Sequence, residues 1–170
     1  MGLLKKIFAM RESRTDVIVP SPPSSEAIAK AEAALTLKFP ASYLSFLREP
    51  PPMRLPLGAR FYSVGEERLG ADNIVEANRR EHEEAFAPLP RFLEAFYNDG
   101  MGNQVCFDTR RVQDGEYPIV FWDHELEADE NLAAAERASG HPERAGVIAW
   151  SFAQWLKILR EMADSQPVSE

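Results

Sequence analysis

Residues 91–109 read RFLEAFYNDGMGNQVCFDT, two apolar segments on either side of a connection that contains two glycines. The segments 91–98 and 103–109 are rich in aromatic and β-branched side chains, which favour β-strands. Gly100 and Gly102 lie in the connection, where glycine can adopt the positive φ angles that a hairpin turn needs. The stretch therefore predicts an antiparallel β-hairpin.

More strands are expected on both sides of this hairpin. Residues 117–122 form an apolar run after the turn-forming pair Asp114-Gly115, and they predict a mostly buried strand. Residues 60–64 and 147–150 predict two shorter strands. Because consecutive hairpins join antiparallel neighbours, the sheet is expected to be antiparallel, with the usual twist.

Two short helices are expected before the sheet. The first begins at Ser24 or Ser25 and carries apolar side chains at helical spacing through Leu35. Pro40 suits the first turn of the second helix, which the run Pro50-Pro51-Pro52 ends.

Two further helices are expected later in the chain. Asp72 is predicted to cap a helix that runs to about Phe86, and its polar composition indicates a surface helix on which His82 is solvated. Ser151 and Gln154 form a capping box for a last helix that should pack on the sheet. The pattern predicts an α+β fold in which an antiparallel, twisted sheet packs against helices.

Length and composition favour one domain. The chain has 170 residues, of which 45% are hydrophobic, enough for a single core. We expect a basic segment and a Pro/Ser linker over residues 1–23, the folded domain over 24–163, and a flexible tail over 164–170. The basic segment is interpreted as a short amphipathic helix that folds back on the acidic body or, less simply, contacts a membrane surface.

Charge and cysteine content exclude several classes of protein. The formal net charge of −8 argues against general nucleic-acid binding, which needs a basic surface to neutralise phosphates. Cys106 is the only cysteine, so neither an intrachain disulfide nor a cysteine-based zinc site is expected, and a cytoplasmic location is predicted. No apolar run approaches the roughly 20 residues of a membrane-spanning helix.

Several motifs follow one another in a characteristic order. A helix with Ile28 and Glu32 precedes the step Phe39-Pro40-Ala41-Ser42-Tyr43. The later motifs are Phe61-Tyr62 and the segments 98–109, 118–125 and 149–156. In this order, the motifs resemble those of the SUKH superfamily, known for yeast cell-wall regulators and bacterial toxin-immunity proteins. Thr36 departs from that pattern, which usually has glycine there, and so does the segment 49–52.

Reactive residues occur singly and do not predict a catalytic site. Cys106 is interpreted as a packed or semi-buried thiol. His124, between Asp123 and Glu125, is interpreted as a hydrogen-bonded strand-end histidine, although a divalent-metal ligand is the alternative. His141 has no identifiable partner. We therefore expect no enzyme activity, no metal and no cofactor.

An acidic stretch is the most informative polar feature. Between Arg111 and Arg137 there is no Lys or Arg, but there are eight acidic residues. A solvated loop is the simplest interpretation, and the functional one is that this loop and the nearby hairpin turn meet a basic protein surface. The predicted partner-binding residues are Asp99, Met101, Asp123, Glu125, Glu127, Asp129 and Glu130.

The resemblance implies a protein-binding role. Bacterial members are commonly immunity proteins, so the chain is expected to bind and neutralise a cognate polymorphic toxin, and nuclease toxins present suitable basic surfaces. The alternative is a regulatory scaffold that holds signalling or envelope proteins.

Overall fold

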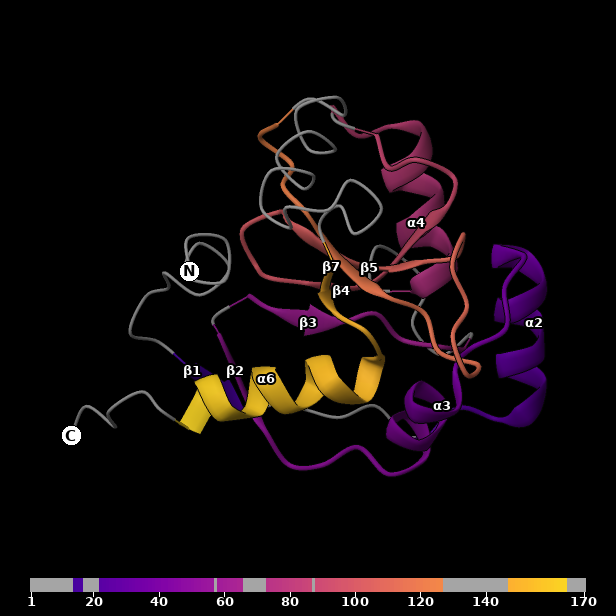
Figure 1. Ribbon diagram of the computed structural model, residues 1–170. Helices are drawn as coiled ribbons and strands as arrows, with labels where there is room; N and C mark the ends of the chain where they lie inside the picture. The colour runs from indigo at the N-terminus through magenta and orange to yellow at the C-terminus, as the bar shows by residue number, and fades with distance from the viewer. Residues whose placement is uncertain are drawn as a thin grey trace.

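The computed structural model describes residues 14–16, 22–56, 58–65, 73–86, 88–126 and 147–164. Its centre is a five-stranded antiparallel sheet in the order β3-β4-β5-β6-β7 (Figure 1). The α+β prediction is confirmed. The strands are β3 (Arg60–Phe61), β4 (Leu93–Asn98), β5 (Gln104–Asp108), β6 (Ile119–Trp122) and β7 (Val147–Ala149); the helices are α2 (Ser25–Leu35), α3 (Ala41–Arg48), α4 (Ile74–Glu83) and α6 (Phe152–Asp164).

A small second sheet lies apart from the main one. Strand β1 (Arg14–Asp16) pairs antiparallel with β2 (Arg54–Pro56). Neither strand was expected from the sequence, and β1 falls within the predicted N-terminal segment and linker. The predicted amphipathic helix before Arg14 and the tail after residue 164 lie outside the described residues.

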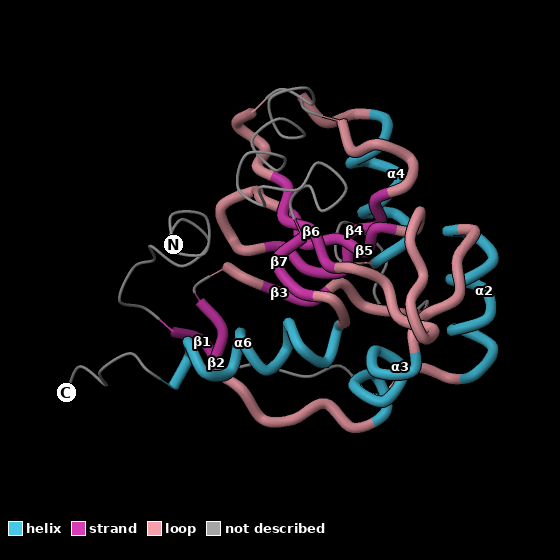
Figure 2. Tube along the Cα trace, viewed as in Figure 1, coloured by secondary structure: helices cyan, strands magenta, loops and turns pink. Residues whose placement is uncertain are grey.

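Helices cover both faces of the main sheet, with α4 on one face and α3 and α6 on the other (Figure 2). All residues of β4, β5 and β6 are therefore buried. The register of β4 against β5 shifts between Ala95 and Tyr97. Phe96 and Tyr97 both contact the ring of Trp155 in α6, with centroids 5.0 and 5.2 Å away.

Hydrogen-bonding side chains define where the helices begin. Ser24 accepts a bond from the Ala27 N–H, and Ser151 accepts one from the Gln154 N–H, as predicted for both helix starts. The prediction for α4 was wrong by one residue, because Asn73 is its cap. Oδ1 of Asn73 accepts the backbone N–H of Val75 at 2.9 Å. Asp72 lies outside the described residues.

The start of α3 is capped by a residue from a different part of the chain. Pro40 occupies the cap position, where its side chain makes no capping hydrogen bond. Glu116, in the connection between β5 and β6, accepts bonds from the backbone N–H of Ser42 at 3.1 Å and from its hydroxyl at 2.6 Å. This contact joins the first half of the chain to the central sheet.

Candidate protein-binding surface

The turn between β4 and β5 is held in shape by the side chain of Asp99. Its Oδ1 accepts bonds from the backbone N–H groups of Met101 and Asn103, at 2.8 and 3.1 Å. Its Oδ2 accepts a bond of 2.7 Å from Nδ2 of Asn103. Asp99 is only 3% exposed. Asp99 is one of the predicted partner-binding residues, and in this structure its buried carboxylate is committed to positioning the turn.

Glycines allow neighbouring segments to approach this turn closely. A Cβ atom at Gly58 would lie 3.3 Å from Cα of Gly100. A Cβ atom at Gly102 would lie 3.0 Å from Nδ1 of His124. Gly102 also has a φ of 101°, which L-amino acids rarely adopt. A side chain at Gly102 would strain the turn and displace the imidazole ring.

The segment after β6 is joined to the same turn through Asn103. Strands β5 and β6 pair with Gln104 opposite Trp122, so the chain leaves β6 beside the turn. Oδ1 of Asn103 accepts a bond of 3.1 Å from the backbone N–H of His124 and lies 2.9 Å from its Nδ1. The predicted strand-end hydrogen bond of His124 is confirmed.

We call the outward part of this assembly the turn surface, which comprises Met101, Asp123, His124 and Glu125. Met101 is 61% exposed, His124 and Glu125 are exposed, and Asp123 is half-buried. Oδ1 of Asp123 accepts a bond of 3.0 Å from the backbone N–H of Glu125, which orders the start of the acidic segment. The turn surface thus combines an adaptable apolar side chain with acidic groups on an ordered backbone.

The structure brings together three of the predicted partner-binding residues, namely Met101, Asp123 and Glu125. The sequence did not single out Asn103 or Gly58 as parts of this assembly. Gly58 is far from the turn in sequence, so only the folded structure reveals their approach. Three other predicted residues, Glu127, Asp129 and Glu130, lie outside the described residues.

The one cysteine of the chain is buried away from the turn surface. Cys106 is fully buried, and its burial, together with the carboxylates of Glu94 and Glu81, raises the pKa of its thiol well above the ordinary value. In the part of the chain that the structure describes, no three or more His, Cys, Asp or Glu side chains gather as a metal site. His141 lies outside that part.

His82 is packed against the sheet rather than solvated, which corrects the sequence prediction. Its side chain is 4% exposed, and its Nε2 lies 3.5 Å from Oε1 of Glu94. Its Nδ1 lies 2.9 Å from the carbonyl oxygen of Leu89. The sequence around His82 gave no sign of its burial, because the run is polar and its neighbours Arg79 and Glu83 do face solvent.

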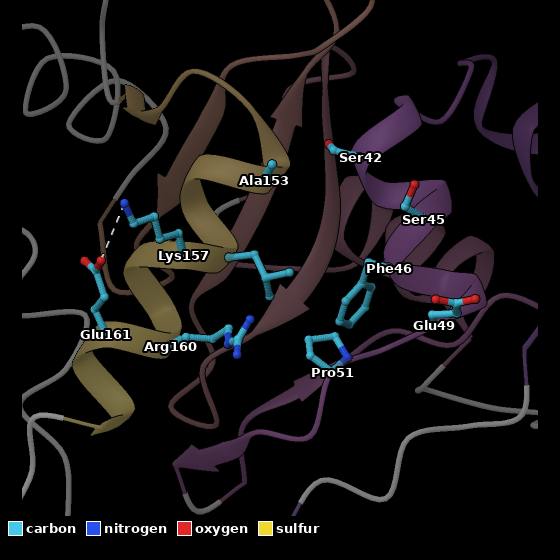
Figure 3. A pocket seen from close by; sticks show the side chains of 10 residues that line it. Ser42, Ser45, Phe46, Glu49, Pro51, Ala153, Lys157, Arg160 and Glu161 are labelled. Atoms are coloured by element: carbon cyan, nitrogen blue, oxygen red, sulfur yellow. Dashed lines mark ion pairs between the residues drawn. The ribbon is translucent and has the colours of Figure 1, made fainter.

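A groove between α3 and α6 offers a second surface (Figure 3). Its volume is about 620 Å³, and Phe46, Pro51 and Leu156 provide apolar lining. On the α6 side, Nζ of Lys157 lies 3.8 Å from Oε1 of Glu161. The groove is on the opposite face of the sheet from α4, so it is separate from the buried pair of His82 and Glu94.

Comparison with known families accounts for most of the chain. The model of the SMI1 / KNR4 family (SUKH-1) matches residues 22–158, which contain the whole main sheet and half of α6. The chain belongs to this family. SUKH-1 membership fits immunity-protein or regulator-like roles. No curated protein matches the sequence. None of the described helices is long and apolar enough to cross a membrane.

Two residues of the opening SUKH-1 motif hold the helices together. Glu32 is buried and accepts bonds from the backbone N–H of Phe39 at 2.9 Å and from Nζ of Lys38 at 2.7 Å. Tyr43 is fully buried, with its ring centroid 4.9 Å from that of Phe152. These residues explain why the motif identifies the fold, but they are not available to a partner.

Proposed function

We propose that this SUKH-1 domain is an immunity protein that binds and neutralises a cognate toxin through the turn surface. The supporting observation is that Met101, Asp123 and Glu125 come together on an ordered backbone at one end of the sheet, where Met101 and Glu125 are exposed. An apolar side chain provides contact area, and the carboxylates favour a basic partner and speed its approach. A nuclease toxin, whose substrate is a polyanion, is one partner of this kind.

Inhibition by binding requires no chemistry from the domain, so we propose that it is not an enzyme. Its single thiol, Cys106, is fully buried, where a substrate would not reach it. Among the described residues, His124 is hydrogen-bonded to an asparagine and has no neighbouring nucleophile in contact. The proposal also places the domain in the cytoplasm, where a lone cysteine stays reduced.

The proposal is tested by affinity capture from the native cells. Tagged protein is used as bait, bound proteins are eluted with increasing salt, and the eluted chains are identified. A second bait carries the amide substitutions Asp123→Asn, Glu125→Gln, Glu127→Gln, Asp129→Asn and Glu130→Gln. We expect a basic toxin domain that elutes at lower salt from this variant, because the charge attraction is reduced.

The control bait carries Glu26→Gln, Glu83→Gln and Glu84→Gln, which neutralise exposed acids on and beside α2 and α4. Capture by this bait should equal that of the native protein. The control removes three negative charges and the other variant removes five, so the loss of binding is compared per charge removed. An equal loss per charge would show that net charge, rather than the acidic residues at positions 123–130, governs binding. If a purified captured toxin keeps full activity with the domain bound, the immunity role is refuted.

A regulatory scaffold is the second candidate, and the groove between α3 and α6 is the observation that favours it. Its apolar lining of Phe46, Pro51 and Leu156 suits a segment of a signalling or envelope protein. Capture of such proteins, with retention that depends on Leu156 rather than on Asp123, would support the scaffold over the immunity protein.

A further inference from the structure

The orientation of the Asn103 side chain is fixed by two different partners. Its Nδ2 donates to Oδ2 of Asp99 at 2.7 Å, and its Oδ1 accepts from the backbone N–H of His124 at 3.1 Å. Exchanging the amide oxygen and nitrogen would place an oxygen against a carboxylate and an NH₂ group against an N–H donor. Only one orientation therefore satisfies both contacts.

This orientation determines which nitrogen of His124 carries the proton. Nδ1 lies 2.9 Å from Oδ1 of Asn103, an acceptor, so Nδ1 must be the donor. In a neutral imidazole, the other nitrogen then has a free lone pair. The ring also packs against Gly102, where a Cβ atom would come within 3.0 Å, so its position is fixed as well as its tautomer.

We propose that His124 determines the specificity of the turn surface by presenting Nε2 as a hydrogen-bond acceptor to an arginine or lysine of the partner. This inference rests on the proposed function. The flanking groups agree with it, because the ionised carboxylates of Asp123 and Glu125 also only accept hydrogen bonds. Met101 lies in the same turn and offers an apolar contact for the carbon stem of a long cationic side chain.

An acceptor-only surface discriminates between partners in two ways. An arginine supplies five N–H donors and a positive charge, so one side chain can engage His124 and a neighbouring carboxylate. A partner that offers carbonyl or carboxylate oxygens would leave Nε2 without a donor and would be repelled by the acids. Hydrogen-bond polarity thus adds to the charge selection that Asp123 and Glu125 provide.

The tautomer is tested on the free, full-length protein by long-range ¹H–¹⁵N NMR at mildly alkaline pH, where imidazoles are neutral. We expect the Nδ1–H form for His124, and Asn103→Ser should weaken that preference while the dispersed spectrum shows that the domain is folded. A dominant Nε2–H form in the native protein would overturn the inference. This measurement involves no partner, so its result is independent of the proposed function.

The donor preference is tested by titrating the protein with argininamide and, separately, with citrulline amide, whose α-amino group is the same but whose side chain is uncharged. Argininamide should shift the Met101 methyl and His124 ring signals but not the methyl signals of Val112, which is exposed and outside the turn surface. His124→Phe should weaken this binding about two- to tenfold, the value of one hydrogen bond. Equal shifts with both compounds, or no effect of His124→Phe, would refute the assigned role.

Failure of the two proposals can be told apart. If argininamide binds as described but the bait with neutralised acids captures the partner as well as the native protein does, the proposed partner-binding surface is wrong. The hydrogen-bonding role of His124 is then still supported. If the partner depends on the acidic residues but His124→Phe changes nothing, the function stands and the specificity role of His124 is wrong.

Discussion

Replacing Thr36 with glycine should stabilise the domain. Helix α2 ends at Leu35, and Thr36 is its C-terminal cap, whose φ of 56° and ψ of 37° lie in the left-handed region. A left-handed conformation costs a residue with a Cβ atom about 1–2 kcal/mol, and glycine avoids this cost. Thr36 is exposed, so the substitution removes no buried contact. The SUKH pattern that the sequence resembles, which usually has glycine at this position, agrees with this geometry.

The expected gain is smaller than the full conformational cost. Glycine also gives the unfolded chain more freedom, which reduces the stabilisation by about 0.4–1 kcal/mol. The net increase in the free energy of unfolding should therefore be about 0.5–1 kcal/mol, or about 1–4 °C in Tm for a domain of this size.

Urea unfolding monitored by tryptophan fluorescence measures the change, because Trp122 and Trp155 are buried in the core. Thr36→Ala is the matched control, since alanine removes the same side chain but keeps the Cβ atom. It should give no comparable gain. A Thr36→Gly protein that is less stable than the native one, or equal to Thr36→Ala, would refute the reasoning.

Three further predictions concern the interior. Glu116→Ala should lower the free energy of unfolding by about 1–2 kcal/mol by uncapping α3 at Ser42, and an equal loss in the exposed control Glu26→Ala would contradict this. Burial opposes ionisation of His82, but Glu94 and the Leu89 carbonyl outweigh it and raise its pKa. The stability from the His82 cation is therefore complete below about pH 6.5, the unfolded pKa, and is lost as pH rises through the folded pKa. In urea unfolding across this pH range, the native protein should have a higher free energy of unfolding than His82→Gln, and this difference should shrink as pH rises. A difference that grows with pH would contradict the prediction. Cys106 should react with a thiol reagent only as fast as the domain opens, so rapid labelling of the folded protein would contradict its burial.

The sequence predicted the central hairpin because its signals are local. The two apolar segments lie within one short stretch of sequence, separated only by the turn that contains Gly100 and Gly102. This turn connects β4 directly to β5. The cap of α6 by Ser151 was predictable for the same reason. Local patterns of this kind carry enough information to define the main elements of the fold.

Contacts between distant segments were not predictable in this way. The cap of α3 comes from Glu116, and the close neighbour of Gly100 is Gly58. The burial of His82 depends on Glu94 in β4, which no local pattern on α4 records. The strands β1 and β2 are three residues each, too short for an alternating pattern to identify them.

The candidate surface was predicted only in part. The acidic stretch indicated Asp123 and Glu125, and the hairpin indicated Met101, but charge counting did not distinguish an exposed acid from one used within the turn. Asp99 shows the difference, since its carboxylate oxygens accept three hydrogen bonds from its own turn. Side-chain hydrogen bonding, rather than the presence of charge, decides which acids can face a partner.

The most direct test of the turn surface is hydrogen–deuterium exchange on the domain alone and on its complex with the captured partner. We predict that binding protects the backbone amides of residues 99–103 and 123–126, while the amides of residues 42–51 and 153–161 around the groove keep their exchange rates. Protection confined to the groove, with no change at the turn surface, would contradict the account.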